Sequence, residues 1–207
     1  MPKPPNFYTN LLAIDCETTG INFNSTDPSD GQQALSWGII VADTQTFTPI
    51  EKLYLEVKWN NASKQSRELD PTFGKRAEEI HGLSFDYLEE NGIEEEDAVI
   101  EIVSLILKYW GPDTCVHTLG HNVHLFDLPF LRATCARYDI PLKFGNRHID
   151  TSSIGLCTVG AYDSNSLFDA YGFEERKDHN AMTDIEQTLQ VAQMTKLLWQ
   201  DKVGLSV

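Results

Sequence analysis

The stretch Ile14-Asp15-Cys16-Glu17-Thr18-Thr19-Gly20 takes the chain from an apolar run, residues 11–14, into a turn at Gly20. Side chains alternate between the two faces of a strand, so Asp15 and Glu17 point the same way at the carboxyl end of the predicted strand. Two adjacent carboxylates repel each other unless a cation lies between them, and hard divalent ions prefer oxygen ligands. The stretch therefore predicts a metal site.

The length of 207 residues is enough for one sizeable hydrophobic core. We expect residues 1–10 to be a short disordered lead-in and residues 11–207 to form a single domain. No apolar run is long enough to cross a membrane, and residues 1–6 lack the apolar region of a signal peptide, so we expect no membrane partner. None of the cysteines is spaced as C-x-x-C, which predicts buried free thiols in a reducing, cytoplasmic compartment. They are Cys16, Cys115, Cys135 and Cys157.

The net charge of −15 excludes a passive nucleic-acid coat, because such a protein needs a basic face. It allows an enzyme that holds a nucleic-acid end through metal ions. Binding is then expected to be weak and sensitive to salt unless the 16 Lys and Arg residues cluster near the site.

Three strands are predicted in the first part of the chain, at the Asp15 stretch, at residues 35–42 and at residues 50–57. Short connections between them predict an antiparallel meander. Residues 58–88 are polar, and we expect short helices and loops there.

An acidic run, residues 94–97, precedes apolar residues that recur at helical spacing. We interpret the acids as favourable charges at the positive end of the helix dipole. The apolar stripe consists of Val99, Ile102, Val103, Ile106 and Trp110.

Strands and helices alternate in the second half of the chain. A strand at residues 114–119 leads into a helix that tolerates Pro129 in its first turn. A second strand, residues 147–150, precedes a helix for which Thr151 or Ser152 is the expected cap.

Two further helices are predicted, a short one at residues 165–171 and a final one that starts near His179. The final helix carries an apolar stripe of Met182, Ile185, Leu189 and Ala192. The order of elements predicts an α/β fold with a mixed β-sheet, in which an antiparallel meander and parallel strands are flanked by helices.

Two more acids lie at predicted helix starts, Asp127 after the strand at residues 114–119 and Asp184 in the final helix. Helix starts that follow parallel strands gather at one edge of a sheet, where ligands usually bind. There they can meet Asp15 and Glu17. Four carboxylates fit a pair of Mg²⁺ or Mn²⁺ ions, which can stabilise the attacking and leaving oxygens of a phosphoryl displacement. His179 precedes Asp184 by five residues and suits the role of proton acceptor.

Three segments resemble the exonuclease motifs of the DEDDh (DnaQ-like) 3′–5′ exonucleases. They are Asp15-x-Glu17-Thr18-Thr19-Gly20, His121-Asn122-x-x-x-Phe126-Asp127 and His179-x-Ala181-x-x-Asp184. The resemblance runs from about residue 11 to residue 198. It implies a ribonuclease H-like fold, a single exonuclease domain at residues 11–207, and release of nucleoside monophosphates from 3′ ends with two divalent metal ions.

The details of the motifs define the subgroup. The sister subgroup has Tyr four residues before the last Asp, where this chain has Asn180, so the His subgroup is the match. Ile80-His81-Gly82-Leu83 and Ile149-Asp150-Thr151 also look like family segments. The second motif departs from the pattern, with three residues between Asn122 and Phe126 where the family often has two. That departure weakens the carry-over of roles to His121 and Asn122.

The resemblance implies that Asp15, Glu17, Asp127 and Asp184 hold the metal ions and that His179 is the general base.

It also implies contacts with the substrate, each with a plainer alternative. Thr18, Thr19 and Gly20 lie against the terminal nucleotide or simply end the strand. Phe126 packs on a terminal base or belongs to the core. Arg176 and Lys177 offset the acidic charge near phosphate or are ordinary solvated residues.

Several other residues have simpler interpretations. Asp150 is expected to be a helix cap or a strand-end residue, and Asp178 to face solvent. The spacing of His117, His121 and His124 suggests zinc, but a strand followed by a turn points these side chains apart.

The leading interpretation is a metal-dependent exonuclease that acts on the 3′ end of single-stranded DNA or RNA. An alternative in the same chemistry is an RNA-trimming enzyme of the oligoribonuclease or ribonuclease T kind, since selection at the 2′-hydroxyl depends on pocket shape. A DNA polymerase that this chain served in proofreading would be a separate protein. The other alternative is an inactive acidic scaffold that binds a basic protein.

Overall fold

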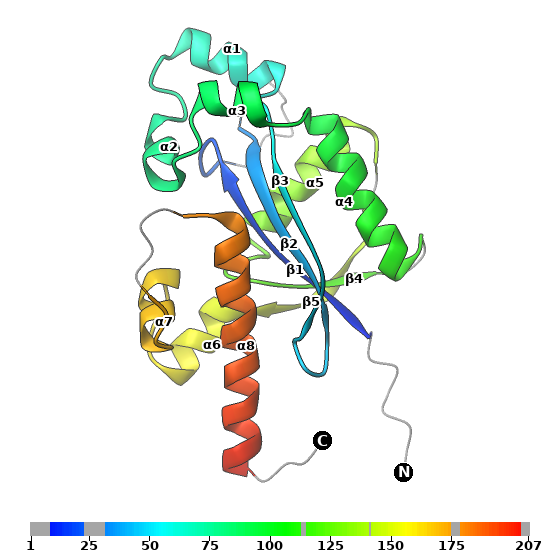
Figure 1. The fold of residues 1–207 in the computed structure, drawn as a ribbon, viewed down its shortest axis with the longest axis vertical. Coiled ribbons are helices and arrows are strands. Elements are labelled where there is room, and N and C mark those ends of the chain that lie inside the picture. The colour runs from blue at the N-terminus through cyan, green and yellow to red at the C-terminus, as the bar shows by residue number, and fades with distance from the viewer. Residues whose placement is uncertain (1–8, 23–31, 113–114, 141, 175–178, 204–207) are drawn as a thin grey trace.

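The computed structural model describes residues 9–22, 32–112, 115–140, 142–174 and 179–203, which form five strands and eight helices (Figure 1). The strands are β1 (Asn10–Thr18), β2 (Ala34–Asp43), β3 (Pro49–Glu56), β4 (Val116–Gly120) and β5 (Phe144–Asp150). The helices are α1 (Asn61–Leu69), α2 (Lys75–His81), α3 (Phe85–Asn91), α4 (Glu95–Trp110), α5 (Asp127–Arg137), α6 (Thr151–Thr158), α7 (Ser164–Ala170) and α8 (Ala181–Val203). Among these residues, none of the helices combines the length and apolarity needed to span a bilayer.

The five strands form one sheet in the order β3-β2-β1-β4-β5. Strands β3, β2 and β1 are an antiparallel meander, whereas β4 and β5 run parallel to β1. This arrangement confirms the predicted mixed α/β sheet. Strand β2, which lies between β3 and β1, is buried at every residue but its last, as expected for a strand covered on both faces.

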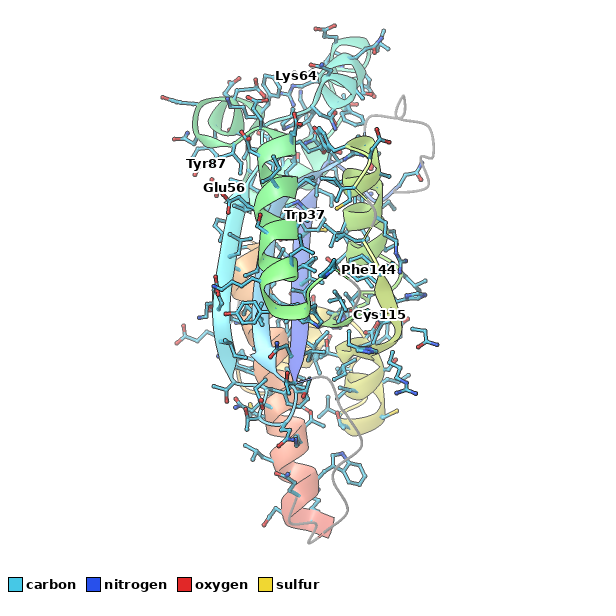
Figure 2. The ribbon with its side chains drawn as sticks, turned by 90° about the vertical axis from the view of Figure 1, so that its right-hand side faces the viewer. Trp37, Glu56, Lys64, Tyr87, Cys115 and Phe144 are labelled. Atoms are coloured by element: carbon cyan, nitrogen blue, oxygen red, sulfur yellow. The ribbon has the colours of Figure 1, made fainter. Side chains whose placement is uncertain are left out.

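Helices cover both faces of the sheet (Figures 1 and 2). Helix α8 packs on one face, where the predicted residues Ile185, Leu189 and Ala192 meet Ala13 and Ile40 of the strands. Helices α4 and α5 pack on the other face, against a larger apolar cluster. That cluster includes Ile14, Trp37, Ile39, Val99, Ile102, Leu128 and Leu131. The alternation of side chains along β1 and β2 therefore supplies both layers of the core.

The three short helices α1, α2 and α3 confirm the expectation for residues 58–88. Asn60 caps α1 by accepting a hydrogen bond from the Ser63 N–H, and Ser84 caps α3 in the same way from the Tyr87 N–H. At the start of α6 the expectation that Asp150 is a helix cap is confirmed, whereas the prediction of Thr151 or Ser152 as the cap is wrong. Asp150, rather than Thr151 or Ser152, accepts the hydrogen bond from the Ser152 N–H at 3.0 Å.

One residue of the acidic run at the start of α4, Glu95, is buried and forms an ion pair. Glu95 is only 5% exposed and forms two hydrogen bonds with the Arg137 guanidinium, at 2.9 and 2.6 Å. The Asn60 amide also contacts this carboxylate. The ion pair ties the start of α4 to the end of α5, which corrects the interpretation of this residue as a dipole charge alone.

The expectation that the cysteines are buried holds for Cys16 and Cys135, whereas Cys115 and Cys157 are exposed. All four are free thiols. Arg176, Lys177 and Asp178 lie outside the described residues, as does most of the expected lead-in at residues 1–10. The division into a lead-in and a single domain stays a prediction.

Helix α8 begins directly above β2, at a position where the strand has no side chain. A Cβ atom added to Gly38 would overlap the carbonyl group of Ala181 and would lie 2.6 Å from the Met182 nitrogen. Backbone cannot move aside as a flexible side chain can. Gly38 is therefore required for the close approach of helix to sheet.

We expect Gly38→Ala to lower the free energy of unfolding by about 1–3 kcal/mol, because the methyl group pushes the first turn of α8 off the sheet. Urea unfolding followed by circular dichroism measures this loss. Gly145→Ala is the matched control, since its methyl group would meet only the His117 ring, a side chain that can move. Equal effects of the two substitutions would contradict the role assigned to Gly38.

Candidate active site

The carboxyl end of β1 presents two acids toward the α8 face of the sheet. Asp15 pairs with Gly38 of β2, and Glu17 pairs with Ser36. Both acids have the same strand parity as Ala13, which packs against α8. The alternation read from the sequence therefore holds, and these two carboxylates share the face on which α8 begins.

Hydrogen bonds fix the end of β1 beyond Glu17. The Thr18 hydroxyl donates to the Gly20 carbonyl at 2.6 Å. The Thr19 N–H donates to the Gln33 carbonyl at 2.9 Å, and the Gln33 N–H donates to the Thr19 hydroxyl at 3.0 Å. These bonds support the plainer alternative for Thr18, Thr19 and Gly20, that of ending the strand.

Asp127 is the first residue of α5 and is 1% exposed. Its Oδ1 accepts a hydrogen bond from the Cys16 N–H at 3.0 Å, which joins α5 to β1. Its Oδ2 is buried and receives no hydrogen bond from the described residues. Burial, which disfavours the charged carboxylate, raises the pKa of Asp127 to about 7. The buried Cys16 thiol lies beside this carboxyl group, and burial raises its pKa as well.

The start of α8 supplies the remaining predicted groups. Asn180 caps the helix, because its Oδ1 accepts hydrogen bonds from the N–H groups of Met182 and Thr183, each at 3.1 Å. Asp184, 6% exposed, lies in the first turn. His179 donates its backbone N–H to the Ile80 carbonyl at 3.1 Å, and its Nδ1 lies 3.3 Å from Oδ2 of Asp184.

One pocket of about 170 Å³ collects these side chains. Its lining residues are Asp15, Cys16, Glu17, His121, Phe126, Asp127, Ser164, Phe168, His179, Asp184 and Thr188. Glu17, His179 and Asp184 are the tightest group, with one potential ligand atom from each within 4.8 Å of the others. Asp15 and Asp127 line the same pocket outside that trio. The pocket is thus rich in the oxygen donors that suit Mg²⁺ or Mn²⁺.

Phe126 belongs partly to the core and partly to the wall of the pocket, and its packing on a terminal base stays a prediction. It is half-buried, packs edge to face on Phe130 with ring centroids 5.2 Å apart, and also lines the pocket. His121 lines the pocket too, with Nδ1 at 3.1 Å from the Thr151 hydroxyl. His117 and His124 make other contacts, with the Arg147 carbonyl and the His148 ring respectively.

Sequence reasoning missed five of the lining residues as site residues, Cys16, His121, Ser164, Phe168 and Thr188. Thr188 follows Asp184 by one helical turn, a spacing that places both on the same face of α8. That spacing could have identified Thr188 as a pocket residue from the sequence. The residues of α7 have no comparable signal, because only the packing of α7 against α8 brings them to the pocket.

Comparison with known proteins gives a family and a fold. A family model described as exonuclease (RNase_T) matches residues 12–192. No curated protein matches the sequence.

Several solved structures are similar to the chain. E. coli Exonuclease I in complex with a dT13 oligonucleotide has a TM-score of 0.70 and 20% identity, over 95% of this chain and 43% of that chain. The zinc-bound E. coli ExoI–ssDNA complex has a TM-score of 0.69 and 19% identity, over 91% and 41% of the two chains. The complex with dA16 has a TM-score of 0.68 and 20% identity, with the same coverage. The chain thus spans about two fifths of the length of these structures, and the likeness is one of fold.

We expect Asp127→Asn to stabilise the metal-free protein at pH 8. The folded-state pKa of Asp127 lies above its ordinary value of 3.8, so the folded state binds the proton more tightly than the unfolded state does. Stability is therefore lost as the pH rises from about 4 to about 7, by up to about 4 kcal/mol for this group, and the amide removes that loss. Urea unfolding in EDTA across this range measures the effect. A wild-type profile that matches the variant's would contradict the assignment.

Proposed function

The chain belongs to the exonuclease family whose model it matches over residues 12–192, and we propose that it removes nucleoside monophosphates from the 3′ ends of single-stranded nucleic acid. Its sheet and helices have the ribonuclease H-like arrangement. The observation that carries the proposal is the meeting of Asp15, Glu17, Asp127, Asp184 and His179 in one pocket. Three separate parts of the chain contribute these groups, and no requirement of the core explains their gathering.

In this proposal Glu17 and Asp184 hold divalent cations together with Asp15 and Asp127. The buried Oδ2 of Asp127 supports this role, because a buried acceptor without a donor is costly and a cation offsets that cost. Two Mg²⁺ or Mn²⁺ ions bound there would stabilise the attacking and leaving oxygens of an in-line displacement at phosphorus.

His179 is the general base of the proposed reaction. Its side chain is 34% exposed at the pocket, so water and substrate can reach it. With Nδ1 facing Asp184, we assign Nε2 to the attacking water, from which it takes a proton as the water oxygen bonds to phosphorus. The carboxylate of Asp184 stabilises the imidazolium that forms.

The substrate is single-stranded, with DNA and RNA as the two classes to be compared. The similar E. coli structures are described as complexes with dT13 and dA16 oligonucleotides, which favours a single strand. The net charge of −15 also suits a basic protein partner, such as a polymerase that the chain would serve in proofreading. Four free thiols favour a reducing, cytoplasmic compartment.

Asp15→Ala is expected to abolish cleavage while the protein stays folded, because the substitution removes a metal ligand and relieves repulsion between carboxylates. The assay uses 5′-labelled single-stranded DNA and RNA of equal sequence in Mg²⁺, Mn²⁺ or EDTA. Wild type should give a metal-dependent ladder that shortens from the 3′ end, and the faster substrate identifies the class. Asp201→Ala, at an exposed position near the end of α8, should behave as wild type. Folded wild type that cleaves neither strand would overturn the proposed function in favour of the acidic scaffold.

His179→Ala is expected to lower kcat by about 10²–10⁴-fold, the usual contribution of a general base. The rise in Tm on addition of Mn²⁺ should be retained, because the carboxylates still hold the metal. Differential scanning fluorimetry with a Mn²⁺ titration separates the two roles of this side chain. Loss of the Mn²⁺ response would identify His179 as a ligand instead of a base.

A further inference from the structure

Three residues form a row across the meander on the face that carries the pocket. Asp15 of β1 pairs with Gly38 of β2, and Gly38 pairs with Tyr54 of β3. The first turn of α8 lies over Gly38, so it has Asp15 on one side and Tyr54 on the other. Tyr54 of the edge strand therefore lies within reach of the start of α8, where it contacts Asn180.

The Tyr54 hydroxyl makes two hydrogen bonds of opposite direction. It donates to Oε1 of Glu56 at 2.9 Å and accepts from Nδ2 of Asn180 at 3.2 Å. Burial and the adjacent Glu56 carboxylate raise the pKa of Tyr54 well above its ordinary value, so the hydroxyl keeps its proton. The Tyr54 hydroxyl uses its proton in the hydrogen bond to Glu56, so its oxygen has a lone pair free to accept the hydrogen bond from the Asn180 amide.

The Asn180 side chain is held at both of its ends. Its Nδ2 points to Tyr54, and its Oδ1 accepts the N–H groups of Met182 and Thr183 at the start of α8. These bonds fix which end of the amide faces the helix. His179, the neighbour of Asn180, donates its backbone N–H to the Ile80 carbonyl, and its side chain contacts Asp184.

Glu56 is itself supported from a third element. The Tyr87 hydroxyl of α3 donates to Oε2 of Glu56 at 2.8 Å, and Figure 2 shows the two residues together at the end of β3. A continuous chain of hydrogen bonds therefore runs from α3 through Glu56 and Tyr54 to Asn180. The nearby ion pair between Lys52 and Glu186 also joins β3 to α8, but both side chains are solvent-exposed and such pairs contribute little.

We propose that Tyr54 is a positioning residue for His179, acting through the Asn180 amide; this inference rests on the proposed exonuclease function. Without the Tyr54 hydroxyl, Asn180 loses its partner in β3, and the backbone that joins it to His179 gains freedom. If the base is displaced from the attacking water, the rate of hydrolysis falls steeply, because small errors in the placement of a catalytic group lower the rate strongly. Tyr54 is not among the residues that line the pocket, so we expect its effect on the rate to depend on His179.

The first test compares Tyr54→Phe with Tyr109→Phe on the same labelled oligonucleotide. Tyr109→Phe is the matched control, because the Tyr109 hydroxyl donates to Glu51 at the opposite end of β3. We expect Tyr54→Phe to lower kcat on the order of tenfold with KM within about twofold, and Tyr109→Phe to keep the wild-type values. Wild-type kcat in Tyr54→Phe would overturn the proposal.

The second test places Tyr54→Phe in the His179→Ala background. If Tyr54 acts through His179, the double variant should have the kcat of His179→Ala alone, and the two effects should not add. An equal further loss in this background would overturn the positioning role and identify a general structural one.

A third readout needs no turnover. Nuclear magnetic resonance of the His179 imidazole, with the folded protein in EDTA, should show a changed signal in Tyr54→Phe and an unchanged one in Tyr109→Phe. An unchanged His179 signal in Tyr54→Phe contradicts the inference. A wild type that gives these signals but no metal-dependent cleavage contradicts only the proposed function.

Discussion

The first turn of α8 rests on the backbone of β2 at Gly38, and the geometry of the candidate site depends on this contact. Asp15 lies beside Gly38 in the sheet, whereas His179 and Asp184 belong to the start of the helix. A side chain at this strand position would separate the two sets of groups. The absence of a side chain brings the acids of the first and last parts of the described fold into one pocket.

Gathering carboxylates in this way opposes folding, because a buried acid without a cation is costly to ionise. The rise in the pKa of Asp127 expresses that cost. It is offset by the apolar layers on both faces of the sheet, which hold β1, α5 and α8 in place irrespective of what fills the pocket. The packing of the core therefore holds the acids close together despite their repulsion. A bound cation would reduce that electrostatic repulsion and stabilise the folded protein.

Sequence patterns anticipated the elements and groups whose signals are local. The apolar runs of β1 and β2, the stripe of α8 and the Asp-x-Glu alternation all depend on neighbours a few residues apart. Groups whose environment comes from distant residues were misjudged. Glu95 is buried because Arg137 reaches it from another helix, and His121 lines the pocket although its motif spacing departs from the family pattern. The exposure of Cys115 and Cys157 likewise depends on which segments cover them.

By itself the sequence determined the mixed α/β sheet, the family, and the candidate carboxylates together with His179, since periodicity and motif spacing are properties of the chain alone. Only the tertiary structure decided that these groups share one pocket, that Gly38 lets α8 approach the sheet, and that Tyr54 reaches Asn180. The physical reason is distance. A hydrogen bond or a steric contact between residues more than a hundred positions apart has no periodic signature, and it exists only once the sheet register and the helix packing bring its atoms together.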